Sequence, residues 1–490
     1  MSSKYGGYTG KILKVDLNKE TYEEYAFTDK QRELFVGGKI MAAKIIYDNI
    51  KTKIKPLSQE NILVVTTCPL TGTGVPSSSR FNISSISPLT GILCSSNCGG
   101  SFGFNLKRAG YEGLIIAGKA KDKTYLKVTD KKVEFLPAQD LWTKTTGETQ
   151  KELGGRSGKI VIGPAGENLV RYACIVSEER AAGRGGLGAV MGSKNLKAVV
   201  AEGTYAPKAA NKEKLKKLSK KWVKKLKDHP FTGDQLPKLG TSGLISKMNF
   251  KKMLATKNFS KGQFEGHDKI NGEYMAENYL IKNNGCISCP IKCGRVVEVD
   301  KKQVKGPELE TLGLLGANLL NDNIELIIRW NYLLDEMGMD TISAAGSLAF
   351  AMELNEKGLW KSGLEFGKTD NIEDIIKETA FRSSDIGNTL ADGTREMSKK
   401  FGGADFSINS KGMEISAYEP RSAVGQGLGY AVSNRGGCHL NAGYLVVLEG
   451  LGLSIDQFTH KGKAALTVTF QNLMEAVSAG GNCLFTTFAV

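Results

Sequence analysis

Three closely spaced thiols are the residues of this chain best suited to bind an inorganic centre. Residues 285–295 read G-C-I-S-C-P-I-K-C-G-R and contain Cys286, Cys289 and Cys293. A fourth ligand would complete the site, and Cys483, in S-A-G-G-N-C-L near the C-terminus, is the best remote candidate. Three local thiolates with one distant thiolate are typical of a [4Fe–4S] cluster. Structural zinc, which more often uses two separated Cys-x-x-Cys pairs or a Cys/His mixture, and unligated cysteines are the alternatives.

Four glycine-rich stretches could bind a phosphate-bearing ligand. They are residues 69–82, 87–104, 163–168 and 179–194. Glycine lets the backbone approach a ligand closely, and consecutive N–H groups can hold phosphate oxygens. Arg80, Arg180 and Arg184 could add charge-assisted hydrogen bonds, and Asn97 could offer its side-chain carbonyl to Mg²⁺. Each stretch alone is better explained by bulges and tight turns, and none matches a P-loop or a G-x-G-x-x-G that opens a helix.

The elements that must position these residues change in character along the chain. β-branched or alternating runs at 11–17, 61–67, 113–117, 125–128, 159–163 and 198–200 predict strands. Helical periodicity predicts helices at 211–227, 309–319, 324–337 and 342–357, whereas 258–284 looks irregular and 402–410 looks like a connector. We therefore predict an α+β fold with a β-rich N-terminal domain at 1–207 and a mainly helical domain at 208–412. A third, mainly helical domain begins at 413–490 and looks incomplete.

Composition indicates a soluble protein of a reducing compartment. The 490 residues are 41% hydrophobic and 24% charged, as in ordinary globular proteins, and the length suggests about three domains. Nine cysteines are too few for a disulfide scaffold in a chain of this length. No secretory signal and no run of about 18 apolar residues is visible in the sequence. We expect a cytoplasmic protein without a membrane span.

Much of the formal charge of +15 is concentrated in one predicted helix, at residues 211–227. Leu215, Leu218, Trp222 and Leu226 recur there at helical spacing, and lysines fill the other face. A solvated surface helix is the simplest interpretation, and docking of an acidic protein partner is the next. Nucleic acid is not expected, because no aromatic RNA-binding signature and no Cys/His finger occurs.

Several motifs in collinear order carry a resemblance to a known family. They include T-G-T-G-V-P-S-S-S-R-F, N-C-G-G-S-F-G-F-N-L-K-R-A-G-Y-E-G, I-G-P-A-G-E-N and R-A-A-G-R-G-G-L-G-A-V-M-G-S-K. They continue through C-I-S-C-P-I-K-C-G-R, G-P-E-L-E-T, D-E-M-G-M-D-T-I-S and G-Q-G-L-G-Y-A-V-S-N-R-G-G-C-H-L. Together they cover nearly the whole chain. The chain resembles the aldehyde:ferredoxin oxidoreductase family, whose members carry tungsten, occasionally molybdenum, on a bis-pyranopterin cofactor.

The resemblance implies the residues that bind the cofactor. The first pterin and its phosphate would be bound by Arg80, Asn97, Gly99, Arg180, Ala181, Gly183 and Arg184, and Asn97 and Ala181 would offer carbonyl oxygens to a bridging Mg²⁺. The second pterin would lie against Asp335, Met339 and Asp340, with Arg435 nearby, and Asn482 is a further predicted contact. Without the resemblance, D-E-M-G would be read as a helix C-terminus with Gly338 as its left-handed residue.

The resemblance also implies catalytic roles for two residues. Glu310 would act as general base or orient the attacking water, and His439 would donate a hydrogen bond to the substrate carbonyl. Otherwise Glu310, like Glu308, fits a helix N-terminus, and His439 fits a buried structural histidine. The implied reaction oxidises an aldehyde to the carboxylic acid. Electrons would leave through a [4Fe–4S] cluster on Cys286, Cys289, Cys293 and Cys483 to ferredoxin, an acidic carrier suited to the basic chain.

Three departures from the family pattern leave an alternative open. Ser478 stands where the family usually has an aspartate that contacts a pterin. The sequence ends soon after Cys483, where family members continue, and it lacks the Glu-x-x-His motif that joins subunits through a metal in some members. A homodimer would therefore need other contacts. The alternative function is a truncated or divergent relative that acts as a non-catalytic or electron-transferring subunit.

Overall fold

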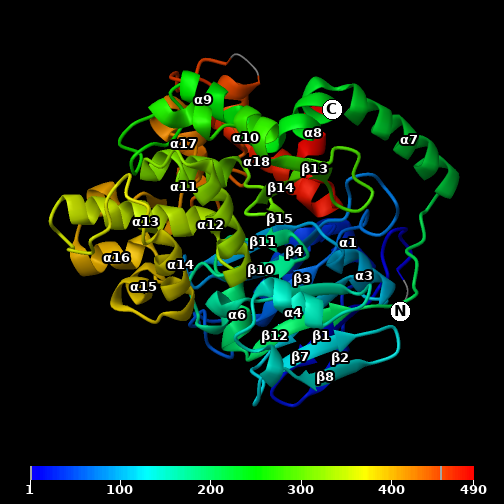
Figure 1. The fold of residues 1–490 in the computed structure, drawn as a ribbon. Coiled ribbons are helices and arrows are strands. Elements are labelled where there is room, and N and C mark those ends of the chain that lie inside the picture. The colour runs from blue at the N-terminus through cyan, green and yellow to red at the C-terminus, as the bar shows by residue number, and fades with distance from the viewer. Residues whose placement is uncertain (1–2, 453–454, 490) are drawn as a thin grey trace.

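The computed structural model describes residues 3–452 and 455–489, and it places two β-sheets below a helical part (Figure 1). The first sheet has the strand order β2-β1-β6-β3-β4-β5. Its strands are β1 (Ile12–Asp16), β2 (Thr21–Tyr25), β3 (Leu63–Thr66), β4 (Phe81–Ile86), β5 (Leu93–Cys98) and β6 (Gly113–Ala117). β1 and β6 are parallel, and the other neighbours pair antiparallel.

The second sheet has the order β11-β10-β9-β12-β7-β8. Its strands are β7 (Thr124–Val128), β8 (Val133–Pro137), β9 (Gly158–Val161), β10 (Ile175–Ser177), β11 (Arg180–Ala182) and β12 (Leu196–Ala201). Helices of this part of the chain are α1 (Asp29–Phe35), α2 (Gly38–Asn49), α3 (Phe102–Arg108), α4 (Thr146–Glu152), α5 (Pro164–Glu167) and α6 (Leu187–Ser193). Only β7 and β12 are parallel neighbours among its pairs.

The middle of the first sheet is covered on both faces, which explains why β3 and β6 read as almost continuous apolar runs. Leu63 and Val65 of β3 contribute to the core that this sheet shares with Leu126 and Val199 of the second sheet. Val64, between them, joins a separate core that includes residues of α2. Successive side chains of a strand point to opposite faces, so a strand covered on both sides needs apolar residues at every position.

The helical part follows β12. Its helices are α7 (Lys212–Asp228), α8 (Leu236–Leu239), α9 (Ile245–Phe250), α10 (Gly272–Tyr279), α11 (Leu309–Leu315), α12 (Ile324–Met337), α13 (Thr341–Glu356), α14 (Ile372–Phe381), α15 (Asp385–Leu390), α16 (Thr394–Phe401), α17 (Val424–Val432) and α18 (Lys463–Gly480). A small sheet joins β13 (Leu280–Asn284), β14 (Gly294–Val299) and β15 (Lys302–Lys305), and β16 (Asn409–Ser410) pairs with β17 (Met413–Glu414). No helix in the described ranges is long and apolar enough to cross a membrane.

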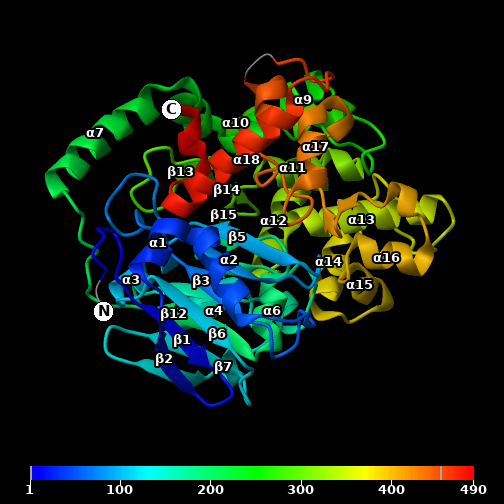
Figure 2. The same cartoon turned by 180° about the vertical axis from the view of Figure 1, so that it is seen from behind.

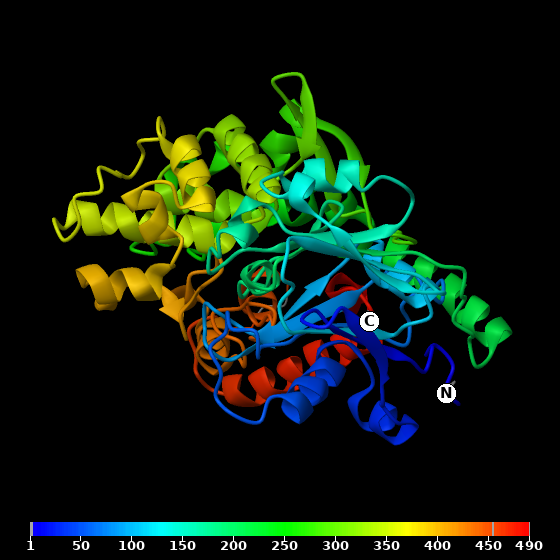
Figure 3. The same cartoon turned by 90° about the horizontal axis from the view of Figure 1, so that it is seen from below.

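The C-terminal helix returns to the N-terminal sheet region. α18 lies beside α2 in Figures 2 and 3, and Lys39 of α2 forms an ion pair with Glu475 of α18. The backbone oxygens of Ser478 and Ala479 pass so close to Gly38 and Gly37 that a Cβ there would approach them within 3.0 Å. This contact fixes the end of α18, and with it the segment that carries Cys483.

The predicted α+β class is confirmed, and the strongly periodic elements lie where the sequence predicts them. β6 and α12 have the predicted bounds, and α7 and α13 each differ by one residue at each end. The alternative interpretation of D-E-M-G also describes the local backbone, because α12 ends there and Gly338 caps it with φ 75°. The segment 258–284 is not irregular, since it contains α10 and β13, and 402–410 includes a turn of 3₁₀ helix at Ala404–Phe406. The division at 207 and 412 stays a prediction.

Candidate active site

All four predicted cluster cysteines line one cavity of about 360 Å³, here called the central cavity. β13 and β14 pair antiparallel from Asn284 and Gly294 outwards, so residues 285–293 form the loop of a hairpin that presents three of the thiols. Cys483 reaches the same cavity from the segment after α18, whose C-cap is Gly481. Segments about 190 positions apart in the sequence therefore converge on one site.

Polar groups surround these thiols. The Ser77 hydroxyl lies 3.2 Å from Cys289 Sγ, and Arg80 donates a hydrogen bond of 2.9 Å to Cys483 Sγ. Burial opposes ionisation of Cys286, but the nearby guanidinium groups of Arg80 and Arg180 outweigh it and lower the pKa of that thiol. A Cβ on Gly99 would come within 2.8 Å of Cys286 Sγ, which accounts for the glycine at that position.

The geometry of the thiols argues against a single metal ion. In the described part of the chain, no three His, Cys, Asp or Glu side chains converge closely enough to hold one ion. A tetrahedral zinc site would need its sulfur ligands all about 2.3 Å from one point. Four thiols spread around a cavity suit a larger centre instead.

Glu310 and His439 face the same central cavity and lie next to each other. Glu310 is in the first turn of α11, and its Oε1 lies 3.5 Å from His439 Nε2. The backbone N–H of Ala417 donates to Glu310 Oε2 at 2.7 Å, which leaves Oε1 with no hydrogen-bond partner among the described residues. The hydroxyl of Ser416 lies 2.6 Å from His439 Nδ1 and orients the imidazole.

Burial shifts the protonation of both residues. It raises the pKa of Glu310 to about 7, although the Ala417 N–H partly opposes the shift. Burial, with Arg184 and Arg435 adding to it, lowers the pKa of His439 well below its usual value. The imidazole is therefore neutral at pH 7, and its approach to Glu310 is not an ion pair. A carboxyl group that titrates near neutral pH is suited to acid–base chemistry.

Aromatic residues that sequence reasoning missed form part of the cavity wall. Tyr418 and Tyr444 both line the central cavity, and their hydroxyls lie 3.0 Å apart. Their rings pack against the His439 ring at centroid distances of 5.6 and 5.4 Å. Ser416 and Tyr418 belong to no motif of the sequence analysis, so no signal in one sequence would have identified them.

A second cavity, of about 270 Å³, adjoins the central one and is here called the Arg435 cavity. The two share Asn97, Ala181 and His439 as lining residues. Five of the lining side chains bury a polar atom that has no hydrogen-bond partner among the described residues: Asn82, Asn97, Arg435, Ser478 and Asn482. Buried polar groups are nearly always paired, so a cluster of unpaired ones fits a ligand rich in hydrogen-bonding groups.

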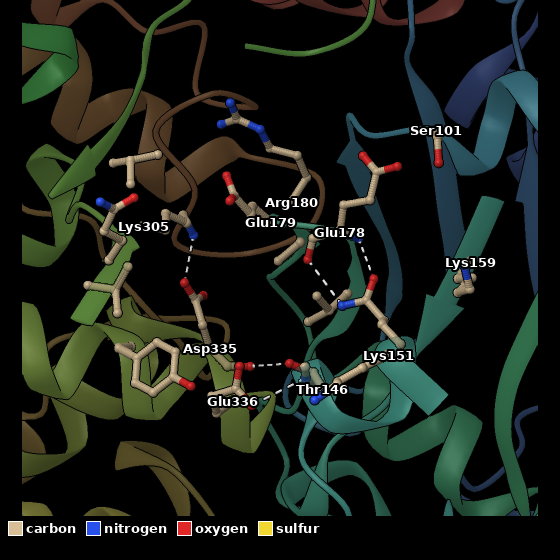
Figure 4. A pocket seen from close by; sticks show the side chains of 18 of the residues that line it. Ser101, Thr146, Lys151, Lys159, Glu178, Glu179, Arg180, Lys305, Asp335 and Glu336 are labelled. Atoms are coloured by element: carbon tan, nitrogen blue, oxygen red, sulfur yellow. Dashed lines mark hydrogen bonds and ion pairs between the residues drawn. The ribbon is translucent and has the colours of Figure 1, made fainter. Parts of the chain in front are cut away.

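A third cavity, of about 580 Å³, also adjoins the central cavity and is here called the Asp335 cavity (Figure 4). Arg180, Ala181 and Lys305 line both. Asp335 lies in the last turn of α12 and pairs with Lys305 at 2.8 Å. The Asp335 carboxylate raises the pKa of Lys305 against the effect of burial.

Three predicted contacts have structural roles in addition to their place near the site. Arg184 lines the Arg435 cavity, but its guanidinium is held by Asp340 at 3.1 Å and by the carbonyl of Gly437 at 2.6 Å. Asp340 also caps α13 through the N–H of Ile342. Met339 is buried, and its backbone pairs with Ala173. Its side chain lines a small separate cavity and none of the three described above.

The other predicted contacts line the central cavity or the Arg435 cavity. Arg80 and Gly99 line the central cavity, and Gly183 lines the Arg435 cavity. Arg435 donates hydrogen bonds to the Ser95 carbonyl and to Cys438 Sγ. The predicted cofactor contacts therefore line three adjoining cavities, except for Met339 and Asp340, which line none of the three.

Comparisons with known proteins agree with the motifs. The family description "Aldehyde ferredoxin oxidoreductase, N-terminal domain" matches residues 12–203, and "Aldehyde ferredoxin oxidoreductase, domains 2 & 3" matches residues 217–490. A tungsten-containing aldehyde ferredoxin oxidoreductase of Pyrococcus abyssi is 41% identical over 99% of this chain and 82% of the relative. That of Pyrococcus furiosus is 38% identical over 99% of this chain and 83% of the relative.

A solved structure shares the fold. The active-site complex BamBC of benzoyl coenzyme A reductase, in complex with 1,5-dienoyl-CoA, superposes with a TM-score of 0.82. The sequences are 26% identical, and the match covers 98% of this chain and 82% of that chain. The full-length matches support a catalytic oxidoreductase over a non-catalytic subunit. The prediction from the motifs is confirmed: this chain belongs to the aldehyde ferredoxin oxidoreductase family.

Proposed function

We propose that this protein oxidises an aldehyde to the carboxylic acid with a tungsten bis-pyranopterin cofactor and passes the electrons through a [4Fe–4S] cluster to ferredoxin. One observation carries the proposal. Glu310 and His439 line the same cavity as the four cysteines, so acid–base groups and a set of metal-binding thiols share one site. The names of the full-length relatives support tungsten, an aldehyde substrate and ferredoxin as acceptor.

The central cavity supplies the ligands for the cluster. Cys286, Cys289, Cys293 and Cys483 would each bind one iron of a [4Fe–4S] cube. Arg80 and Arg180 would offset part of the negative charge of four thiolates. They lower the pKa of Cys286, whereas burial raises the pKa of Cys289 and Cys293. All nine cysteines are free thiols, which supports the reducing cytoplasm expected from the sequence.

The adjoining cavities would hold the two pterins. The unpaired polar atoms of Asn82, Asn97, Arg435, Ser478 and Asn482 fit one pterin and its phosphate. Asn97 and Ala181 line both the central and Arg435 cavities, where their oxygens would be available to hold a Mg²⁺. Lys305 and Asp335 would contact the second pterin, in the Asp335 cavity. Arg180, predicted at the first pterin, also lines this cavity, and Arg435, predicted near the second, lines the other cavity instead. Ser478 lines the Arg435 cavity, so a hydroxyl replaces the carboxylate usual in the family.

The residues of this chain would position and activate the reactants. When bound, the tungstopterin supplies an acceptor for the two electrons released by R-CHO + H₂O → R-COOH + 2 H⁺ + 2 e⁻. Glu310 Oε1 would accept a proton from the attacking water, because its pKa of about 7 allows it to be ionised near neutral pH. His439 is neutral, and with Nδ1 beside the Ser416 hydroxyl its Nε2–H would donate to the substrate carbonyl oxygen.

A metal and activity assay tests the proposal. The protein is purified without oxygen from cells grown with tungstate, and aldehyde oxidation is followed with a redox dye. Tungsten, molybdenum and iron are measured by mass spectrometry on the same samples. We expect activity in proportion to bound tungsten. Aldehyde oxidation by a sample with neither tungsten nor molybdenum would refute the proposed function.

A further inference from the structure

Helix α7 presents a dense field of positive charge at the edge of the molecule. Its 17 residues include nine lysines and two acidic residues, and all nine lysines are exposed. None of the nine forms an ion pair with a described residue. In Figures 1, 2 and 3 the helix runs along the periphery, with its N-terminal half away from the body of the protein. The lysine charges of α7 are therefore not neutralised by ion pairs with the described residues.

The other end of α7 is anchored beside the cysteine hairpin. Leu226 is buried, and together with Trp222 it belongs to a small apolar cluster that also contains Ile291, Cys289 and Cys293. The lysine-rich helix and two of the four predicted cluster ligands therefore share one patch of core. The lysine-rich helix is therefore joined to the cysteine hairpin, whose thiols would hold the cluster that passes electrons to the acceptor.

A groove of about 500 Å³ lies beside the helix. On the helix it is lined by Lys212, Leu215, Lys216, Ser219, Lys220 and Val223, and on the opposite side by Thr73 and Gly74. The loop that supplies Thr73 and Gly74 continues to Ser77, whose hydroxyl lies 3.2 Å from Cys289 Sγ. The groove combines two apolar side chains with a rim of lysines, which suits an apolar residue surrounded by carboxylates.

The cysteine hairpin itself reaches the surface. Ile287, Ser288 and Lys292 are exposed, with Ile287 at 40%, and Cys286, Cys289 and Cys293 are only partly buried. A partner seated on α7 could therefore contact the hairpin as well. Electron transfer favours such an arrangement, because the donor centre then lies directly beneath the docking surface.

We propose that α7, the groove beside it and the exposed tip of the cysteine hairpin form the docking surface for an acidic electron-carrier protein. The inference rests on the proposed function and adds the surface that its acceptor recognises. Complementary charge steers an acidic partner to the lysines and accelerates its encounter with them. The groove and Ile287 would then fix its orientation over the thiols.

An acidic protein fits this surface better than a membrane or a nucleic acid. An interfacial membrane helix needs a free apolar face, whereas Leu218 is the only apolar residue of α7 that is more than half exposed, and Leu226 is buried against the protein. Single-stranded nucleic acid is usually bound with exposed aromatic side chains that stack on bases, and the one aromatic residue of α7, Trp222, is partly buried in the cluster with Ile291.

A charge-reversal triple variant tests the docking surface. Lys216→Glu, Lys220→Glu and Lys224→Glu follow one side of α7, and all three side chains are exposed. The matched control is Lys119→Glu, Lys121→Glu and Lys131→Glu, which changes the net charge equally at exposed positions flanking β7. β7 lies at the opposite end of the molecule from α7 (Figures 1 and 2). Thermal unfolding of both variants checks that they fold.

Binding and turnover are measured separately. Calorimetry at low salt gives the Kd for an acidic ferredoxin, and steady-state assays give kcat/KM with ferredoxin and with a small redox dye. We expect the α7 variant to raise the Kd and to lower the ferredoxin kcat/KM by at least about tenfold, with a weaker salt dependence. Dye-linked turnover should stay unchanged, and the control variant should bind ferredoxin like the wild type.

The outcomes distinguish this inference from the proposed function. Unchanged ferredoxin binding by the α7 variant would overturn the docking surface, as would an equal loss in the control. If the α7 variant lost binding to phosphatidylserine vesicles or to RNA but still bound ferredoxin, the helix would serve another partner. That result would overturn the docking surface too. Absent dye-linked aldehyde oxidation in the tungsten-loaded wild type would refute the proposed function instead, and the binding assay would still report on the surface.

Discussion

The pairing of Glu310 with His439 follows from burial of both side chains in one cavity. Burial penalises the charged form of any titratable group, so it raises the pKa of a carboxylic acid and lowers that of an imidazole. Glu310 is raised to about 7 and His439 is lowered well below its usual value. Near neutral pH the pair holds few charges, and the carboxyl group can gain or lose a proton at little cost. A base and a hydrogen-bond donor 3.5 Å apart can then act on one small substrate.

Replacing Glu310 by Gln should remove the base while preserving the shape of the cavity. We expect kcat/KM for aldehyde oxidation to fall by roughly 10²-fold or more, a typical contribution of general base catalysis. In the wild type, kcat/KM should rise with pH around a midpoint of about 7, because only the carboxylate accepts a proton. The dye-linked assay between pH 5 and 9 measures both. If the pH profile of kcat/KM in Glu310→Gln kept its midpoint near 7, that midpoint would belong to another titratable group.

The same residue should make stability depend on pH. The pKa of Glu310 in the folded protein lies above the unfolded value of 4.5, so its stabilising contribution is complete below 4.5. That contribution is lost as the pH rises through about 7, because folding then has to bury a carboxylate. We expect cofactor-free Glu310→Gln to gain Tm relative to the wild type at pH 8.5 and to gain little at pH 5. Calorimetry at the two pH values measures the difference, and an equal gain at both would contradict the assignment.

Removing one thiol should remove the cluster. Cys289→Ala deletes a proposed cluster ligand that lines the central cavity, and the variant should lose the visible absorption and most of the iron and sulfide. Cys94→Ala is the matched control, because Cys94 is buried in the core and lines none of the three site cavities. Iron and sulfide analysis compares the two. Full iron content in Cys289→Ala would refute this ligand set.

At the scale of elements, the end of α18 decides whether the site closes. α18 packs against α2, and Gly481 then turns the chain with φ 97° so that Asn482 and Cys483 enter the cavities. Such a backbone conformation strains any residue with a Cβ. A Cβ at Gly481 would also lie 2.6 Å from Cys68 Cβ. The fourth thiol therefore depends on a glycine that contacts no ligand itself.

Adjacent glycines allow a matched test of this turn. Gly481→Ala should destabilise the protein by ~1–3 kcal/mol and displace Cys483, which should lower the iron content. Gly480→Ala should be tolerated, because Gly480 lies in α18 and a Cβ there meets nothing within 4 Å. Thermal unfolding and iron analysis of both variants measure the effects. Equal losses in the two variants would show that the conformation of Gly481 is not the cause.

The elements predicted correctly are those whose own residues specify them. α12 has apolar residues at helical spacing, an Asn323 side-chain cap and a left-handed Gly338, so its bounds were predictable. β4 and β5 were missed because they are rich in serine and asparagine, and their register sets Asn82 opposite Asn97. Those polar residues pair across the sheet or face a cavity, and a single sequence does not show either relation. Tertiary context decided these strands.

At the scale of the whole molecule, the site lies where the N-terminal sheets, the helical part and the C-terminal segment meet. The resemblance of the motifs to a family identified most of the predicted residues. That these residues meet at one site is a property of the fold, which the motifs alone do not show. Ser416, Tyr418 and Tyr444 escaped prediction because their roles arise only when β17, α11 and the His439 segment come together. The lysine-rich helix was visible in the sequence, but its position beside the cysteine hairpin was not.

X-ray diffraction from crystals of the anaerobically purified enzyme, recorded at the absorption edges of tungsten and iron, tests the central claim most directly. We predict one tungsten peak between the Arg435 and Asp335 cavities, beside Glu310 and His439. We predict iron density enclosed by Cys286, Cys289, Cys293 and Cys483. A tungsten peak away from these cavities, or iron density that Cys483 does not touch, would contradict the account.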